Sequence, residues 1–274
     1  MSKIDFTQTL AAGLGAYNTN VGQWWVNKTR NAAHAAAYMN IANHVAQCAR
    51  GEGGLIIDYG CGPGLLIKRL ADLLPAWKFI GIDGSKVMLH GAETWARTKR
   101  KGRRASIEFR LAKLPDFSAS TPKADIIVFT FPNVVTVASE RRRFEGIFSE
   151  DREVAGLLAM KQEKGEGVEA LYDQLFMSRV VARNLRFLLR SGGLCVRVDY
   201  SQGTRDELSR FDQVSTLFEE GSLKARQSRL KPQKFFHLLY SHYYPSNVII
   251  DVFEQTKDKD FLEGGYLVSL LQAL

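Results

Sequence analysis

The residues most suggestive of chemistry are an acidic side chain followed by alternating glycines, in the stretch Asp58-Tyr59-Gly60-Cys61-Gly62-Pro63-Gly64. An apolar run precedes this stretch, and the residues after Gly64 have the periodicity of a helix. A strand, a tight glycine turn and a helix build the nucleotide site of many α/β sheets, because glycine lets a ligand approach the backbone. The stretch therefore predicts a nucleotide-type site.

Two common phosphate-binding patterns do not fit this turn. The dinucleotide fingerprint needs a glycine where this chain has Leu65, and no Gly-Lys-Ser/Thr follows as a Walker loop requires. A second acidic residue, Asp83, ends the apolar segment 77–82 at about 20 residues after Gly60, the offset at which a carboxylate accepts from a ribose diol. Asp83 could also cap a helix that begins at Lys86, and the two roles are compatible.

Three segments in the correct order resemble the class I S-adenosylmethionine-dependent methyltransferases. Asp58 to Gly64 resembles their motif I, an acidic residue followed by G-x-G-x-G, and 81–89 is similar to their G-x-D-x-S-x-x-M-L stretch. The segment 189–195 resembles their L-x-x-G-G-x-hydrophobic turn. The resemblance spans about 51–200. It implies S-adenosyl-L-methionine as cofactor and a three-layer, doubly wound α/β fold with a seven-stranded, mostly parallel sheet.

The resemblance also implies which residues hold the cofactor. They are Asp58, Gly60, Cys61, Gly62, Gly64, Asp83, Gly84, Met88, Ala112, Lys113 and Phe131. The chain departs from the family before Leu114-Pro115, where many relatives carry an Asp that accepts from the adenine amino group and this chain has Arg110 to Lys113. Backbone groups near Ala112 and Lys113, with apolar contacts from Met88, are then expected to read the adenine.

The elements that position these residues follow from periodicity. Strands are predicted at 55–58, 77–83, 106–111, 124–131, 194–199, part of 235–245 and 265–271, and helices at 31–50, 66–74, 86–98, 168–188 and 247–257. Residues 17–25 are predicted to form a loop. Residues 1–50 then form an N-terminal helical arm or lid and 51–274 the methyltransferase domain. A helical insertion after the fourth strand, at about 134–167, is either a substrate cap or a surface hairpin.

The residues that would meet the methyl acceptor are less well determined. By the resemblance, Tyr17 and Trp24 are candidates for a lid, with Trp24 next to the substrate. Asn133, after the fourth strand, either orients the proton of the nucleophile or caps a turn. If the acceptor arrives protonated, the candidate general bases are His237 and His242, then Tyr17. His237 and His242 are expected to face opposite sides of a strand, so that at most one points into the pocket.

Net charge and motif content indicate which classes of substrate and partner fit this chain. The net charge of +8, clustered at 97–104, 141–143 and 224–234, favours an anionic partner, but no aromatic residue interleaves with the first cluster as single-strand binding usually requires. The Asn/Asp-Pro-Pro-aromatic tetrapeptide of amino-group methyltransferases acting on nucleic acid or protein is absent. A small-molecule substrate is the leading expectation; RNA or protein methylation and a non-catalytic S-adenosylmethionine-binding subunit are the alternatives.

Three scattered cysteines, no metal-ligand spacing and no long apolar run complete this profile. They predict a cytoplasmic protein with free thiols, no metal and no membrane association.

Overall fold

The computed structural model describes residues 17–28, 30–98, 105–112, 121–131, 181–201, 235–246 and 265–274. Seven strands form one sheet in the order β3-β2-β1-β4-β5-β7-β6. The strands are β1 (Leu55–Tyr59), β2 (Lys78–Asp83), β3 (Ser106–Leu111), β4 (Ala124–Thr130), β5 (Leu189–Ser201), β6 (Phe236–Pro245) and β7 (Gly265–Ala273). The helices are α2 (Asn20–Lys28), α3 (Ala32–Cys48), α4 (Leu65–Leu73), α5 (Lys86–Thr98) and α9 (Ala182–Leu188).

Strand direction fixes where a ligand can bind. The first five strands are parallel, β7 is antiparallel to β5, and β6 is antiparallel to β7. β1 pairs with β2 on one side and β4 on the other, so the strand order reverses there. Ligands of open α/β sheets sit at such a switch point, beyond the carboxyl ends of the strands. Asp58 lies at this edge, near the end of β1.

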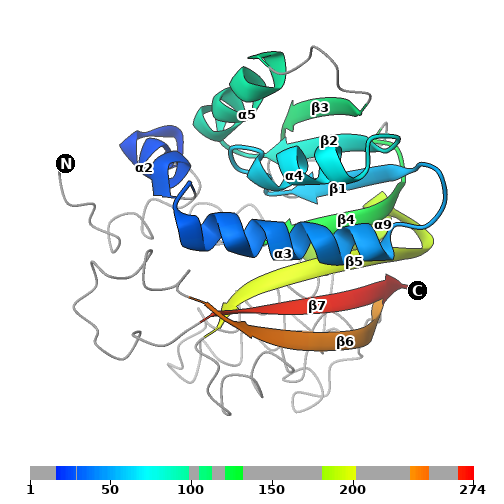
Figure 1. Cartoon of the computed structure of the whole chain (residues 1–274). Coiled ribbons are helices and arrows are strands. Elements are labelled where there is room, and N and C mark those ends of the chain that lie inside the picture. Colours follow the sequence, from blue (N-terminus) through cyan, green and yellow to red (C-terminus); the bar gives the residue numbers. More distant parts are fainter. Residues whose placement is uncertain are drawn as a thin grey trace, which may run out of the picture.

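Helices cover both faces of the sheet, which confirms the predicted three-layer α/β fold. Side chains at alternate strand positions point to opposite faces. One set, with Ile56 and Val128, packs against α3 and α4, and the other, with Ile57 and Phe129, packs against α9. α3 runs across the sheet from the carboxyl edge and joins this core, although it belongs to the predicted arm (Figure 1).

Two local predictions are wrong. Residues 20–28 form helix α2 and not a loop, because Val26 is buried where α2 lies beside α5, and this tertiary contact overrides the weak local propensity. The glycine turn at 190–193 lies within β5 as a register shift. Pairing passes from Ala124–Leu189 to Ile126–Leu194 and leaves the residues between out of the ladder.

Several predictions fall outside the described residues, including the insertion at 134–167, Lys113 and Asn133. None of the helices in the described ranges is both long and apolar enough to cross a membrane.

Candidate active site

The glycine turn after β1 leaves open space at the carboxyl edge of the sheet. The backbone N–H groups of Gly60 and Cys61 both donate to the carbonyl of Ile82, at 2.8 and 3.0 Å, so the turn is fixed to the end of β2. Gly60 and Gly62 have φ of 75° and 51°, in the left-handed region that favours glycine. A Cβ at either residue would meet no atom within 4 Å. Backbone therefore lines a space that a ligand could fill.

Asp58 is a buried carboxyl group without a partner beside this space. Its exposed fraction is 1%, and neither carboxylate oxygen has a hydrogen bond. Burial raises the pKa of Asp58 to about 8, and the nearby charge of Asp83 adds to the effect. Buried polar groups normally have partners, and an unsatisfied one often marks a functional site. A cationic group placed here would return the pKa of Asp58 toward its ordinary value.

Asp83 links the end of β2 to the glycine turn. Its Oδ2 accepts from the backbone N–H of Gly62 and its Oδ1 from that of Ser85, both at 2.8 Å. These bonds lower the pKa of Asp83, but burial raises it by more. A carboxylate has about four acceptor positions, so capacity for a diol remains. The cap of α5 itself is Ser85, whose Oγ accepts from the N–H of Met88 at 3.3 Å.

The segment that carries the glycine turn and Asp83 matches a known family. Residues 56–149 match the family model of a methyltransferase domain. This match, together with the strand order of the sheet, supports a class I S-adenosylmethionine-dependent methyltransferase domain in this chain. S-adenosylmethionine is the cofactor of this family, and the unpaired Asp58, the open turn and the spare acceptor capacity of Asp83 fit its cationic groups and ribose diol.

Solved structures agree with the fold of this methyltransferase. One is the [4+2]-cyclase SpnF, with a TM-score of 0.52 and 13% identity over 85% of this chain and 80% of that one. Another is magnesium protoporphyrin IX methyltransferase (ChlM) from Synechocystis PCC 6803 with bound SAM, with a TM-score of 0.51 and 11% identity over 98% and 99%. At these identities the likeness establishes the fold alone. No curated protein matches the sequence.

The N-terminal arm of the methyltransferase is tied to the loop after β2. Ser85 Oγ donates to the backbone carbonyl of Tyr17 at 2.7 Å, and the N–H of Lys86 donates to Asn18 Oδ1 at 2.8 Å. Asn18 therefore satisfies a free donor at the start of α5. The predicted lid residue Tyr17 lies beside Ser85, two positions from Asp83. Trp24 lies in α2, and its side chain is outside the described part of the structure.

The other predicted cofactor residues in the described ranges lie at the same edge. Ala112 follows β3, and its N–H donates to the carbonyl of Asp83 at 3.1 Å. Met88 is buried in α5. Cys61 is also buried, and its own burial raises the pKa of its thiol. The residues at this edge are Asp58, Gly60, Cys61, Gly62, Gly64, Asp83, Gly84, Met88, Ala112 and Phe131. Their roles in cofactor binding stay predictions.

An aromatic wall, defined here as Tyr38, Phe131, Tyr200 and Tyr266, continues this edge beyond β4. Phe131 stacks on Tyr200 with ring centroids 4.3 Å apart, and it meets Tyr38 and Tyr266 edge to face at 6.0 and 6.1 Å. Phe131 also has φ of 47°, which is rare for a bulky residue and marks strain of the kind that clusters at active sites. The wall adjoins the cofactor site, because the charge of Asp58 contributes to the raised pKa of Tyr38.

The two histidines predicted as bases lie on β6, outside the aromatic wall, although His242 contacts Tyr244, whose ring stacks on Tyr266 of the wall. β6 is the outermost strand, four strands from β1, and at ~4.8 Å per strand the separation is about 19 Å. His237 begins β6 opposite Gln272, at the amino edge, and His242 pairs with Val268. Because a register shift lies between Leu238 and Tyr240, His237 and His242 share one face of the sheet, and the expectation of opposite faces is wrong.

The sequence reasoning missed a hydrogen-bonded group at the start of α3. Asn31 Oδ1 accepts from the backbone N–H of His34 at 2.8 Å and lies 3.1 Å from His34 Nδ1. His34 Nε2 lies 3.1 Å from the hydroxyl of Tyr200. The signals were weak ones. Asn31 precedes a helix, and Tyr200 ends a strand at the ligand-binding edge.

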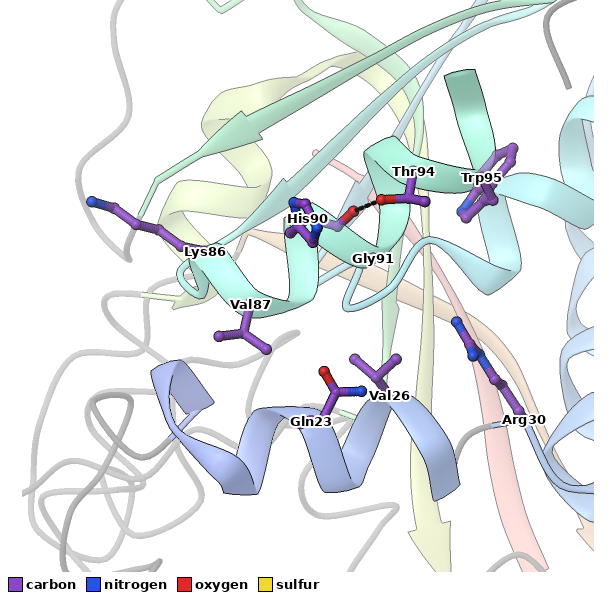
Figure 2. A pocket seen from close by; sticks show the side chains of 9 residues that line it. All are labelled: Gln23, Val26, Arg30, Lys86, Val87, His90, Gly91, Thr94 and Trp95. Carbon is purple, nitrogen blue, oxygen red and sulfur yellow. Dashed lines mark hydrogen bonds between the residues drawn. The ribbon is translucent and has the colours of Figure 1, made fainter. Parts of the chain in front are cut away.

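A groove lies between α2 and α5 (Figure 2). Gln23 and Val26 of α2 face Val87 of α5 there, whereas Lys86 extends away from the groove. The basic side chains around this groove do not converge on one point, so we assign it no ligand.

Proposed function

We propose that this methyltransferase transfers a methyl group from S-adenosylmethionine to an N, O or C nucleophile of a small molecule, by in-line displacement in an enclosed pocket. The observation that carries the proposal is the unpaired, buried Asp58 between the open glycine turn and the aromatic wall. A cationic cofactor and a largely apolar acceptor are the ligands that these two neighbouring environments suit.

The cofactor side would be held by three kinds of group. Asp58 would compensate the cationic ammonium group, the backbone of Gly60 and Gly62 would line the turn, and Asp83 would accept from the ribose hydroxyls. When bound, S-adenosylmethionine supplies a methyl group on a sulfonium, which is already an excellent leaving group. The protein then contributes mainly alignment and exclusion of water, and alignment alone is worth roughly 7–11 kcal/mol.

Enclosure supports a small acceptor. α3 covers the sheet up to the carboxyl edge, and Tyr17 is fixed to the loop after β2 by the bond from Ser85. Tyr17 also contributes to the raised pKa of Tyr200, so the two phenols lie within electrostatic range across the site. The arm and the aromatic wall would together cover a bound acceptor.

RNA or protein methylation is the second candidate, and the net charge of +8 favours it. Within the described residues, some of this charge is paired, since Arg97 bonds Glu93 at 3.0 Å and Arg110 bonds Glu108 at 2.7 Å. The third candidate is a non-catalytic binding subunit. It is motivated by the sequence before Leu114, where the chain lacks the Asp with which many relatives bind the adenine amino group.

Calorimetry with S-adenosylmethionine and S-adenosylhomocysteine tests the cofactor site. Asp83→Ala removes charge-assisted acceptors and is expected to weaken binding about 10–100-fold, whereas the exposed Asp72→Asn on α4 is the matched control. Equal binding by Asp83→Ala and wild type would contradict the placement. RNA affinity that is measurable at low salt and falls steeply with added salt would favour the second candidate over a small acceptor.

A further inference from the structure

The strongest remaining feature is the chain of hydrogen bonds Asn31–His34–Tyr200. The orientation of the Asn31 amide follows from its partners, because the backbone N–H of His34 can only donate and therefore faces the oxygen. That same oxygen accepts from His34 Nδ1. The Nδ1 atom then carries the proton of the neutral ring, Nε2 is an acceptor, and the hydroxyl of Tyr200 donates to it.

The surroundings of His34 hold the ring in this orientation. Its exposed fraction is 0%. The ring meets those of Phe131 and Tyr200 edge to face at 6.1 and 6.3 Å, and lies 6.4 Å from that of Tyr38. A nucleophile or base held by a second group, which a third group orients, is the general arrangement of catalytic relays. Here Asn31 orients the ring of His34, and that ring is bonded to the hydroxyl of Tyr200.

Tyr200 lies near the end of β5, at the carboxyl edge of the sheet. It stacks on Phe131, directly after β4 and next to the strand-order switch between β1 and β4. Its phenol is within electrostatic range of Tyr38, which is in turn within range of Asp58. Tyr200 therefore belongs to the aromatic wall beside the cofactor site and is also bonded to the buried ring of His34.

We propose that Tyr200 and His34 together accept the proton of the methyl acceptor, and that the acceptor is therefore a hydroxyl group, phenolic or enolic, that becomes a methyl ether. The inference rests on the proposed function and names its acceptor class. A carboxylate, a thioether or a neutral amine needs no proton removed before it attacks the methyl group, so such an acceptor has no use for a relay of this kind.

The atoms and electrons balance in this step. The acceptor oxygen forms a bond to the methyl carbon, and the carbon–sulfur bond breaks with its electron pair going to sulfur. The acceptor proton passes to the Tyr200 oxygen while the Tyr200 proton passes to His34 Nε2. The products are the methyl ether, S-adenosylhomocysteine and a His34 imidazolium, whose proton afterwards leaves by way of the Tyr200 hydroxyl.

The first test needs no acceptor and no turnover. Nitrogen-15 NMR of the histidine rings at neutral pH should show His34 with its proton on Nδ1, and Tyr200→Phe should shift the Nε2 resonance of His34. The matched control is Tyr244→Phe, which removes the hydroxyl bonded to His44 on the same helix and should shift the resonances of His44 but not those of His34. A proton on Nε2 of His34, or on both nitrogens, overturns the proposal.

The second test compares two phenolic acceptors, one unsubstituted and one with a para-nitro group that leaves it largely ionised at neutral pH. Tyr200→Phe and His34→Gln should lower kcat for the first about 10²–10⁴-fold and for the second by less than about 10-fold, with KM and the affinity for S-adenosylhomocysteine unchanged. Equal losses for both acceptors, or methylation confined to carboxylate, amine or thioether acceptors, overturn the relay. Failure of wild type to bind S-adenosylmethionine would instead overturn the proposed function, while the NMR result still decides the relay.

Discussion

The two ends of α3 each pair a histidine with a tyrosine of the sheet. His34, in the first turn, bonds Tyr200 of the central strand β5, and His44, about 15 Å further along, bonds Tyr244 of the edge strand β6. His34 is fully buried, and Asn31 fixes its orientation, whereas His44 is half-buried and within electrostatic range of His242. Both places hold a histidine bonded to a tyrosine, but the tautomer of His34 is set by Asn31, whereas the ring of His44 is accessible to solvent.

The difference comes from position in the sheet and not from residue type. The inner pair lies beside the strand-order switch, where Asp58 and Phe131 also carry unusual features. The outer pair is His44 and Tyr244. Tyr244 lies on β6, which is the edge strand because β7 lies between β5 and β6. A histidine–tyrosine bond is thus informative about function only together with the groups that surround it.

The largest expected effect concerns Asp58, at the inner end. Its native pKa of about 8 lies above that of an unfolded aspartate, so the native state binds more protons between about pH 4 and 8, and the free energy of unfolding falls as pH rises through that window. The loss is at most about 6 kcal/mol. Asp58→Asn should remove most of this slope in urea titrations across that window. An unchanged slope would mean that Asp58 has another partner in solution.

Removing each histidine should separate the two ends of α3 by stability. His34→Ala leaves a buried cavity and removes the bond to the Tyr200 hydroxyl, and should lower the free energy of unfolding by about 2–4 kcal/mol. His44→Ala should cost less than about 1 kcal/mol, because solvent can replace its bond to Tyr244. Chemical denaturation of both variants measures the difference. Equal costs would show that burial does not distinguish the pairs.

Asn31 carries two functions that one substitution can separate. Asn31→Ala removes the N-cap of α3 and the partner of His34 Nδ1, and should cost about 1 kcal/mol of stability. Asn31→Ser retains a capping oxygen on a shorter side chain, so it should restore most of the stability without restoring the orientation of His34. Denaturation together with nitrogen-15 NMR distinguishes these results. Restoration of both properties by Ser would contradict the role of Asn31 in setting the tautomer.

The parts of the candidate active site that can be predicted from the sequence are those in which the residue type alone determines the backbone conformation or the chemistry. Gly60 and Gly62 adopt left-handed backbone, and Asp83 ends a buried strand, so the turn and its acidic neighbour can be predicted from the sequence. The relay cannot, because His34 and Tyr200 meet only through the packing of α3 across the sheet. Strand order in space likewise sets the distance of His237 and His242 from β1, so this distance cannot be read from the sequence, and their role as bases stays a prediction.

The smallest expected effect is the pH response of the outer pair. Burial, and then the nearby His242, lower the pKa of His44 below its ordinary value. The unfolded state therefore binds more protons than the native state near and below pH 6.5, and the free energy of unfolding falls as pH drops through that range. His44→Gln should reduce this acid-side slope by a few tenths of a kcal/mol per pH unit, since one partly exposed histidine contributes only a fraction of a proton. The Asp58 slope overlaps this range and has the opposite sign, so the contribution of His44 is measured by adding His44→Gln to the Asp58→Asn variant. An acid-side slope that survives His44→Gln would assign that proton uptake to another group.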